Sequence, residues 1–220
     1  MFEIVITGDG SHTLYVSELD EHYHSIHGAI QESDHVFIIN GLDYCKADQV
    51  CIFETGFGTG LNAFLSAIYS VTHNKKIFYT SIEKYPLSES IINSLNYKEF
   101  VEERYAYLFE KIHSCRWDLK QDILPGFTLL KIKGDLLTSS LKGHYDTIFF
   151  DAFGPEKQPD MWTDEVLGKI SEITAPGGIL VTYCVKGSVQ RSLKKSGFNI
   201  SLLPGPPGKR FVLRGIKSEK

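Results

Sequence analysis

The sequence predicts an α/β protein with a mostly parallel sheet that helices cover on both faces. Short runs of apolar and β-branched residues alternate along the chain with segments that carry apolar residues at helical spacing, and this alternation is typical of parallel sheets. Two of the predicted strands, 147–150 and 179–183, are near-continuous apolar runs, as strands buried on both faces are. The last two, 198–203 and 210–216, are joined by a Pro- and Gly-rich turn too short for a parallel crossover, so we expect them to pair antiparallel.

The elements follow in chain order from local residue patterns. Residues 3–7 and 12–16 are β-rich runs on either side of the turn sequence Gly8-Asp9-Gly10-Ser11, which predicts a β-hairpin. A helix is expected over 25–33. Further strands are expected at 50–54, 76–83, 127–133, 145–153 and 179–184, and further helices at 61–71, 87–95, 98–113, 162–174 and 187–196. We expect residues 1–48 to form an N-terminal extension, a hairpin plus a helix, packed on a main domain of residues 49–220.

The composition is that of a folded, soluble chain. Of its 220 residues, 42% are hydrophobic and 23% are charged, enough for a sizeable core. No apolar run reaches the about 18 residues that a membrane span needs, and the N-terminus carries no secretory signal. The four cysteines form no C-x-x-C pair, so neither a zinc site nor a disulfide framework is predicted. This cysteine usage favours a reducing, cytoplasmic compartment.

The formal net charge of −4 conceals an asymmetry between the two ends of the chain. As a total, it argues against a simple basic nucleic-acid-binding protein. Residues 1–49, however, hold nine acidic residues and one lysine, and residues 186–220 hold nine basic residues and one glutamate. The basic end favours an anionic partner. The alternative is that these basic residues only cover the solvent-exposed surface of a helix and a tail and bind no partner.

A glycine-rich loop follows the predicted strand at 50–54 and leads directly into a helix. It reads Glu54-Thr55-Gly56-Phe57-Gly58-Thr59-Gly60. Glycines let a backbone turn sharply and approach a ligand closely, and the new helix offers free N–H groups. The spacing differs from the G-x-G-x-x-G of dinucleotide sites. The Glu54 carboxylate would repel a pyrophosphate and face a cationic ligand such as S-adenosylmethionine, and a purely structural turn is the alternative.

Acidic residues stand at the ends of three further strands. In open α/β sheets, ligands bind outside these carboxyl ends. Glu83, followed by Lys84, is placed to accept hydrogen bonds from ribose hydroxyls. Gly134-Asp135 ends the next strand, where the carboxylate would accept a bond from an adenine amino group or cap a helix. Asp151 follows four apolar residues and is expected at the lip of the cleft.

Aromatic and histidine residues near these strand ends are candidates for lining a pocket. Phe153 and Trp162 would enclose something flat, although Trp162 is equally well explained as core. The histidines of segment 22–27 do not have the spacing of helical zinc ligands, so no metal site is predicted. We interpret His24 and His27 as pocket or capping residues.

Four motifs in the chain resemble those of a known family. They are Y-H-S-I-H-G-A at 23–29 with Glu32-Ser33 and H-V-F-I at 35–38; E-T-G-F-G-T-G-L-N at 54–62; D-A-F at 151–153 with Pro159, Met161 and Trp162; and P-G-G at 176–178 before Thr182-Tyr183, with Gly208-Lys209-Arg210. Together, over about residues 2–216, the chain resembles the methyltransferase half of MnmC-type tRNA-modifying enzymes, or its stand-alone, MnmD-like form.

The resemblance implies a fold, a reaction and partners. The fold is the Rossmann-like class I methyltransferase fold, with residues 49–220 as the methyltransferase domain. The reaction transfers a methyl group from S-adenosyl-L-methionine to the 5-aminomethyl group of the wobble uridine in tRNA, giving 5-methylaminomethyl-(2-thio)uridine. Fused relatives carry a flavin-dependent domain that prepares the amine. We expect no such domain in this chain, and expect a separate flavin-dependent enzyme to act upstream.

The strand-end positions, taken together with the resemblance, predict roles for individual residues. Asp151 is the expected catalytic residue, which holds the amine and helps to remove its proton, as a base or as an orienting group. The expected cofactor-binding residues are Glu54, Gly56, Phe57, Gly58, Gly60, Asn62, Glu83, Lys84, Gly134, Asp135 and Asp151. The expected tRNA-binding residues, which enclose the base or hold the anticodon stem-loop, are His27, Phe153, Trp162, Tyr183, Lys209 and Arg210.

Two other functions remain open from the residues alone. One is a small-molecule amine methyltransferase or aminopropyltransferase of the spermidine-synthase type, whose small cationic acceptor has no use for a basic tail. The other is a nucleotide-binding module without catalysis. The run of acidic and glycine signatures at four strand ends argues against a module that only binds.

Overall fold

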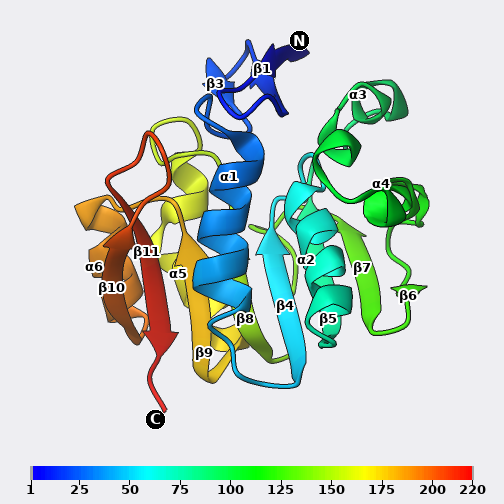
Figure 1. The fold of residues 1–220 in the computed structure, drawn as a ribbon. Helices are drawn as coiled ribbons and strands as arrows, with labels where there is room; N and C mark the ends of the chain where they lie inside the picture. The colour runs from blue at the N-terminus through cyan, green and yellow to red at the C-terminus, as the bar shows by residue number, and fades with distance from the viewer. Residues whose placement is uncertain (1, 220) are drawn as a thin grey trace.

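The computed structural model describes residues 2–219, and an eight-stranded sheet forms its centre (Figure 1). The sheet order is β10-β11-β9-β8-β4-β5-β7-β6. The strands are β4 (Gln49–Thr55), β5 (Lys76–Glu83), β6 (Gln121–Leu124), β7 (Phe127–Lys133), β8 (Tyr145–Phe150), β9 (Thr174–Thr182), β10 (Phe198–Pro204) and β11 (Phe211–Lys217). The five central strands run parallel, and β11 lies antiparallel between β9 and β10. This arrangement confirms the predicted fold class and the antiparallel pair at its end.

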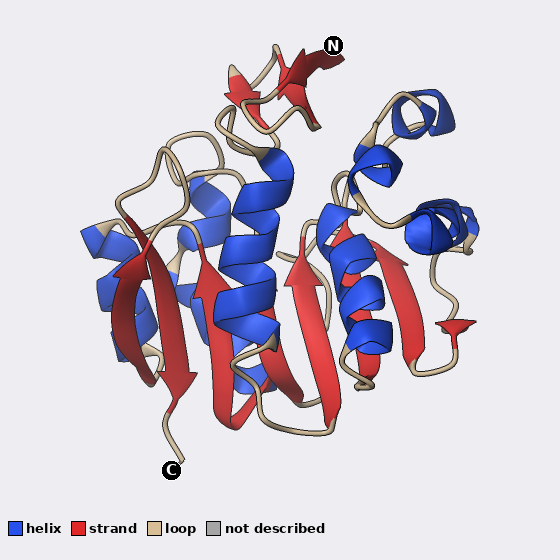
Figure 2. Cartoon of the chain, in the orientation of Figure 1, coloured by secondary structure: helices blue, strands red, loops and turns tan. Residues whose placement is uncertain are grey.

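Helices cover both faces of this sheet, as Figure 2 shows. They are α1 (Ala29–Ser33), which continues as a π-helix over Asp34–Leu42, α2 (Leu61–Thr72), α3 (Glu89–Asn93), α4 (Glu103–Ser114), α5 (Asp164–Ile173) and α6 (Gly187–Lys195). The π-helix packs on β8, β9 and α2, and α5 packs on β9. Within residues 2–219, no helix has the length and apolar character that crossing a bilayer requires.

The two sheet faces carry separate apolar clusters, and the strand sequences explain why. Successive side chains in a strand point to opposite faces. In β8, Ile148 and Phe150 join the cluster that includes Leu167 of α5, whereas Phe149 joins the cluster that includes Phe37 and Phe64. Both faces are therefore buried, which accounts for the uninterrupted apolar runs of the central strands.

The N-terminal hairpin is confirmed, with β1 (Phe2–Ile6) paired antiparallel to β2 (His12–Val16). A third short strand, β3 (Glu21–His22), was not predicted. The predicted helix at 25–33 begins only at Ala29, and the helical backbone then runs on to Leu42. The segment 29–42 thus packs on the central sheet, and the division of the chain at residue 48 stays a prediction.

Several predicted boundaries were wrong. The helices expected over 87–95 and 98–113 are shorter: α3 spans Glu89–Asn93 and α4 spans Glu103–Ser114. A 3-10 turn at Tyr97–Phe100 lies between them. Strand β6 was not predicted. The helix expected over 162–174 spans only Asp164–Ile173, and β9, expected from residue 179, begins at Thr174 and includes the Pro-Gly-Gly sequence at 176–178.

Gly168, in the middle of α5, offers a test of the helix packing. No atom outside the helix lies within 4 Å of the position that a Cβ would take. Alanine loses less conformational freedom than glycine when it becomes helical, so Gly168→Ala should raise the free energy of unfolding by about 0.5–1 kcal/mol in urea denaturation. Gly177→Ala is the matched control, because Gly177 has a φ of +73° and alanine there should lower stability. A loss of stability in Gly168→Ala would contradict the packing described for α5.

Candidate functional site

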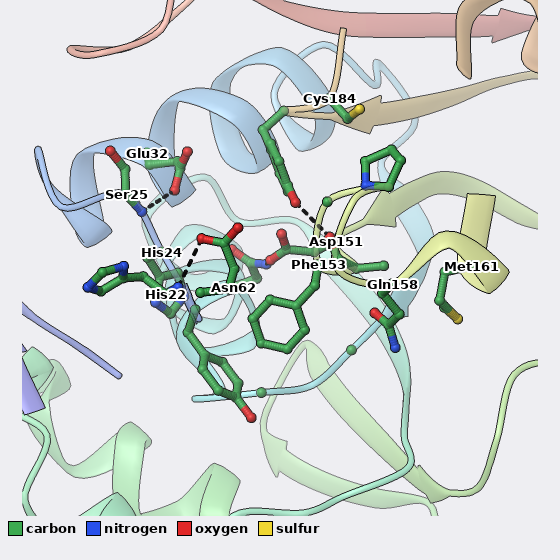
Figure 3. A pocket seen from close by; sticks show the side chains of 18 of the residues that line it. His22, His24, Ser25, Glu32, Asn62, Asp151, Phe153, Gln158, Met161 and Cys184 are labelled. Atoms are coloured by element: carbon green, nitrogen blue, oxygen red, sulfur yellow. Dashed lines mark hydrogen bonds between the residues drawn. The ribbon is translucent and has the colours of Figure 1, made fainter. Parts of the chain in front are cut away.

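A cavity of about 900 Å³ opens at the carboxyl ends of the parallel strands. Its floor comes from the residues that follow β4, β5, β7, β8 and β9. Two segments from opposite ends of the chain, residues 21–27 and 208–211, complete the wall; Figure 3 shows His22, His24 and Ser25 of the first segment. The cavity therefore lies where ligands of open α/β sheets bind.

The glycine loop after β4 forms one side of this cavity. Gly56, Gly58 and Gly60 all have left-handed backbone, with φ of +84°, +51° and +73°, a conformation that glycine adopts without strain. The Gly58 N–H donates to Oε2 of Glu83 at 3.0 Å. A Cβ on Gly58 would lie 3.1 Å from ring atoms of Tyr23. The loop is thus fixed to the end of β5 and has no room for a side chain at its tip.

Asp151 lies directly after β8 at the cavity wall, and Asn62 of α2 fixes its orientation (Figure 3). The Asn62 Nδ2 donates to Oδ2 of Asp151 at 2.8 Å, and the Asp151 N–H donates to Thr55 Oγ1 at 3.0 Å. Burial raises the pKa of Asp151 to about 7, with a further increase from the nearby Glu32 carboxylate. The Asp151 carboxyl can therefore hold or release a proton near neutral pH.

Glu32 of α1 is a second carboxyl in the same cavity, and it is not among the site residues that the strand ends predicted. Its side chain is 9% exposed, and its Oε2 accepts a hydrogen bond from the Ser25 N–H at 2.7 Å. Its Oε1 lies 2.9 Å from the Lys209 ammonium. Glu32 belongs to a helix of the N-terminal segment, so it follows no parallel strand. Its place in the Y-H-S-I-H-G-A motif region was the signal that could have found it.

The Lys209 side chain is directed toward a carboxylate inside the cavity, and its contact with tRNA stays a prediction. Its ammonium faces Glu32 and lies 5.0 Å from the centre of the Tyr183 ring. The Tyr183 hydroxyl donates to the Ala152 carbonyl at 2.8 Å, which fixes the ring beside Asp151. Of the two basic residues predicted here, only Arg210 is exposed at the cavity rim.

Glu83 and Asp135 line the cavity at the ends of β5 and β7. The two Glu83 oxygens accept the N–H groups of Gly58 and Tyr85 at 3.0 and 2.7 Å. Asp135 pairs with Lys84 at 2.8 Å. Its Oδ1 also accepts the N–H of Leu137 at 2.9 Å, which closes a turn; the helix expected to be capped there is not formed, because strand β8 is the next element. Hydrogen bonding to Lys84 lowers the pKa of Asp135. Gly134 also lines this part of the cavity.

Three predicted site residues do not line the cavity. Glu54 is 1% exposed beneath the loop, and burial raises the pKa of its carboxyl to about 8. Glu54 therefore lies behind the cavity wall, and its contact with the cofactor stays a prediction. Gly60 begins α2 and packs against the His113 ring. Trp162 is core, packed edge-on against Phe150.

Trp162 nevertheless positions a residue that does line the cavity. Its Nε1 donates to the Phe153 carbonyl at 2.7 Å. The Phe153 ring meets Tyr23 edge-to-face at 5.1 Å between centroids, so two aromatic rings stand at the cavity wall. The backbone of Phe57 lines the cavity as well, with its ring packed against Trp117.

The histidines of segment 22–27 take different roles. His27 is exposed and packs against Gly208, where a Cβ would overlap its ring. His24 is buried, and burial lowers its pKa to about 4, so it is neutral. Among the residues that the structure describes, no group of three or more His, Cys, Asp or Glu side chains is arranged to hold a metal ion.

Sequence comparisons relate the chain to methyl-transferring proteins. A family model described as S-adenosyl-L-methionine-dependent methyltransferase matches residues 96–218. The tRNA 5-methylaminomethyl-2-thiouridine biosynthesis bifunctional protein MnmC of Leptospira interrogans is 31% identical over 98% of this chain and 35% of its own length. The protein of the same name from Pseudomonas fluorescens is 32% identical over 89% of this chain and 32% of its own. The chain thus spans about a third of these relatives.

Comparison of structures gives a consistent result. MnmC2 of Aquifex aeolicus superposes with a TM-score of 0.82 and 28% identity, over 100% of this chain and 71% of that one. Spermidine synthase of Thermotoga maritima superposes with a TM-score of 0.53 and 12% identity, over 96% of this chain and 69% of that one. The second similarity extends to the fold alone.

Proposed function

This chain belongs to the S-adenosyl-L-methionine-dependent methyltransferase family, and we propose that it methylates the 5-aminomethyl group of the wobble uridine in tRNA. The product would be 5-methylaminomethyl-(2-thio)uridine. One observation carries the choice of acceptor: a carboxyl poised to titrate near neutral pH, Asp151, faces the cavity together with the buried Glu32. Two carboxyls suit a cationic amine and would repel an anionic acceptor.

The cavity residues fit a cationic nucleoside cofactor. A Cβ on Gly56 would lie 3.1 Å from the Asp151 carbonyl oxygen, so only the bare glycine backbone fits there, and the same holds at Gly58. The buried Oδ1 of Asn62 has no hydrogen-bond partner within residues 2–219 and can accept one from a ligand. Each Glu83 oxygen already accepts one N–H and keeps a lone pair for a ribose hydroxyl. These residues would hold S-adenosyl-L-methionine.

When bound, S-adenosyl-L-methionine supplies a methyl group on a sulfonium, which an amine lone pair can attack in line. The protein's own residues prepare that amine. Ionised Asp151 binds the alkylammonium through a charge-assisted hydrogen bond and takes up its proton, which leaves a neutral nitrogen with a directed lone pair. Asn62 keeps the carboxylate in one orientation. Holding the reacting atoms close and aligned supplies much of the rate enhancement in such transfers.

We infer that the acceptor is presented by the anticodon stem-loop of tRNA. The similarity to proteins named for tRNA 5-methylaminomethyl-2-thiouridine biosynthesis supports this. Tyr23 and Phe153 offer ring faces to a base taken out of the loop stack. Arg210, exposed at the rim, offers a cation to the phosphates. tRNA as the acceptor implies a cytoplasmic location, and the four free cysteines are compatible with it.

We further infer that a flavin-dependent activity, outside residues 1–220, supplies the 5-aminomethyl group. The relatives are named as bifunctional proteins, and the chain matches about a third of their length. An aminopropyltransferase of the spermidine-synthase type remains a weaker candidate, since only the fold is shared with such an enzyme.

The defining experiment measures transfer of tritiated methyl from S-adenosyl-L-methionine to tRNA purified from a strain that lacks the modification. Incorporation into the wobble nucleoside, identified by mass spectrometry of the digest, is the expected result. A parallel reaction with putrescine and decarboxylated S-adenosylmethionine tests the aminopropyl alternative. Label that stays out of tRNA would refute the proposal.

The titration of Asp151 predicts an acid limb in the pH profile. Protonated Asp151 neither binds an ammonium nor accepts its proton, so kcat/KM should decline as the pH falls through about 7. The hydrogen bond from Asn62 lowers the pKa of Asp151, so Asn62→Ala should move this limb to higher pH. The pKa of the tRNA amine is independent of Asn62. A limb that stays in place in Asn62→Ala would show that the titrating group is the substrate.

A further inference from the structure

We propose that Glu32, Asp151 and Tyr183 form a subsite for an alkylammonium ion, and that the Lys209 side chain occupies it until the acceptor's ammonium displaces it. The inference deepens the proposed function, because it names the residues that would recognise the cationic amine. It also assigns a role to Lys209, which was expected to bind phosphate.

The burial of Glu32 is the first observation. A carboxylate on a side chain that is only 9% exposed needs compensating partners, since removing it from water is costly. Its Oε2 has the Ser25 N–H. Among the described residues, its Oε1 has no hydrogen-bond partner and forms an ion pair with the Lys209 ammonium, at 2.9 Å. One buried carboxylate oxygen at the cavity wall is therefore satisfied by a single mobile cation.

The surroundings of the Lys209 ammonium are the second observation. It lies between a carboxylate and an aromatic face, 5.0 Å from the centre of the Tyr183 ring. Carboxylates and aromatic faces together are the usual means by which proteins bind alkylammonium ligands. Asp151 is within electrostatic reach as well, because the Lys209 charge lowers the pKa of its carboxyl. Lys209 thus already occupies an environment that an aminomethyl group would require.

The loop that carries Lys209 explains how the subsite can be vacated. Residues 205–210 connect β10 to β11, and the loop is held by the bonds from the Gly205 N–H to the Arg210 carbonyl and from the Lys209 N–H to the Pro206 carbonyl. Gly208 is fixed against His27. The backbone can therefore stay in place while the flexible Lys209 side chain swings away from Glu32.

Binding of a simple alkylammonium tests the subsite without tRNA. The probe is propylammonium, titrated by calorimetry into the full chain. Lys209→Met keeps much of the side-chain volume but removes the resident cation, so it should bind propylammonium about tenfold more tightly than the wild-type protein does. The double variant Glu32→Gln with Lys209→Met has no buried unpaired carboxylate at position 32, so its folding carries no cost from one. It should lose the tenfold gain in affinity for propylammonium. Equal affinity in all three proteins would overturn the proposal.

Methylation kinetics on tRNA test the displacement. Lys209→Met should lower KM for tRNA, because the acceptor no longer competes with an internal ammonium, and Glu32→Gln should raise it about tenfold with an unchanged affinity for S-adenosyl-L-methionine. A higher KM and a weaker salt dependence in Lys209→Met would instead show that Lys209 is a phosphate contact. A wild-type protein inactive on tRNA would overturn the proposed function, and the propylammonium titration would still decide on the subsite.

Discussion

Asp151→Asn should lower kcat for methyl transfer to tRNA by about 10²–10⁴-fold, the range typical of a removed acid–base group. The amide keeps the shape of the side chain but can neither neutralise an ammonium nor take its proton. Because Asp151 already has a raised pKa in the folded protein, removing its charge should not destabilise the fold. The measurement is tritiated methyl incorporation into tRNA under single-turnover conditions.

Two further measurements separate an effect of Asp151→Asn on the chemical step from an effect on cofactor binding. Calorimetric affinity for S-adenosyl-L-methionine should change little in Asp151→Asn, since the glycine loop and Glu83 are left intact. Asp160→Asn is the matched control, because Asp160 is an exposed carboxylate at the rim of the same cavity and should keep wild-type turnover. Near-normal turnover in Asp151→Asn would remove this residue from the mechanism.

Gly58→Val should weaken S-adenosyl-L-methionine binding by at least about tenfold. Gly58 has a φ of +51°, and a Cβ there lies 3.1 Å from the Tyr23 ring. A β-branched residue resists this backbone conformation, so the loop must move. That movement breaks the hydrogen bond from the Gly58 N–H to Glu83. Calorimetry with S-adenosyl-L-methionine measures the loss directly.

A second glycine of the cavity provides the comparison. Gly154 has no left-handed backbone, and a Cβ there would meet only the Tyr183 hydroxyl, at 3.8 Å. Gly154→Ala should therefore bind the cofactor as the wild-type protein does. If Gly58→Val also retained full affinity, the loop after β4 would not be the cofactor cradle. If both variants lost affinity, the loss would reflect general sensitivity of the cavity.

The sequence predicted the parts of this protein that local patterns determine. Strands β5 and β7 were predicted to the residue, because apolar runs buried on both sheet faces leave a strong signal. Asp151 and Glu83 were found because the carboxyl ends of parallel strands converge on one cavity. The position of a residue at a strand end was thus enough to place it near the site.

Side-chain direction and long-range pairing were beyond sequence reasoning. Glu54 ends the same strand as the glycine loop, yet its side chain is buried under the loop rather than in the cavity. In the sequence, nothing distinguishes Lys209 from the other basic residues near the C-terminus. Its side chain is directed into the cavity by an ion pair with Glu32, which is far away in the chain. Trp162 directly follows Met161, which lines the cavity, yet its own side chain packs into the core. Each outcome depends on contacts between residues far apart in the chain.

The position of β11 has a consequence for the order in which the protein becomes functional during synthesis. This last strand inserts between β9 and β10, which are made before it, and the loop at its start carries the residue that pairs with Glu32. A nascent chain can form the glycine loop and its neighbouring strands early, as domains fold from the N-terminus. The acceptor side of the cavity is complete only when the ribosome has delivered the final strand, so an unfinished chain lacks a formed site for the amine.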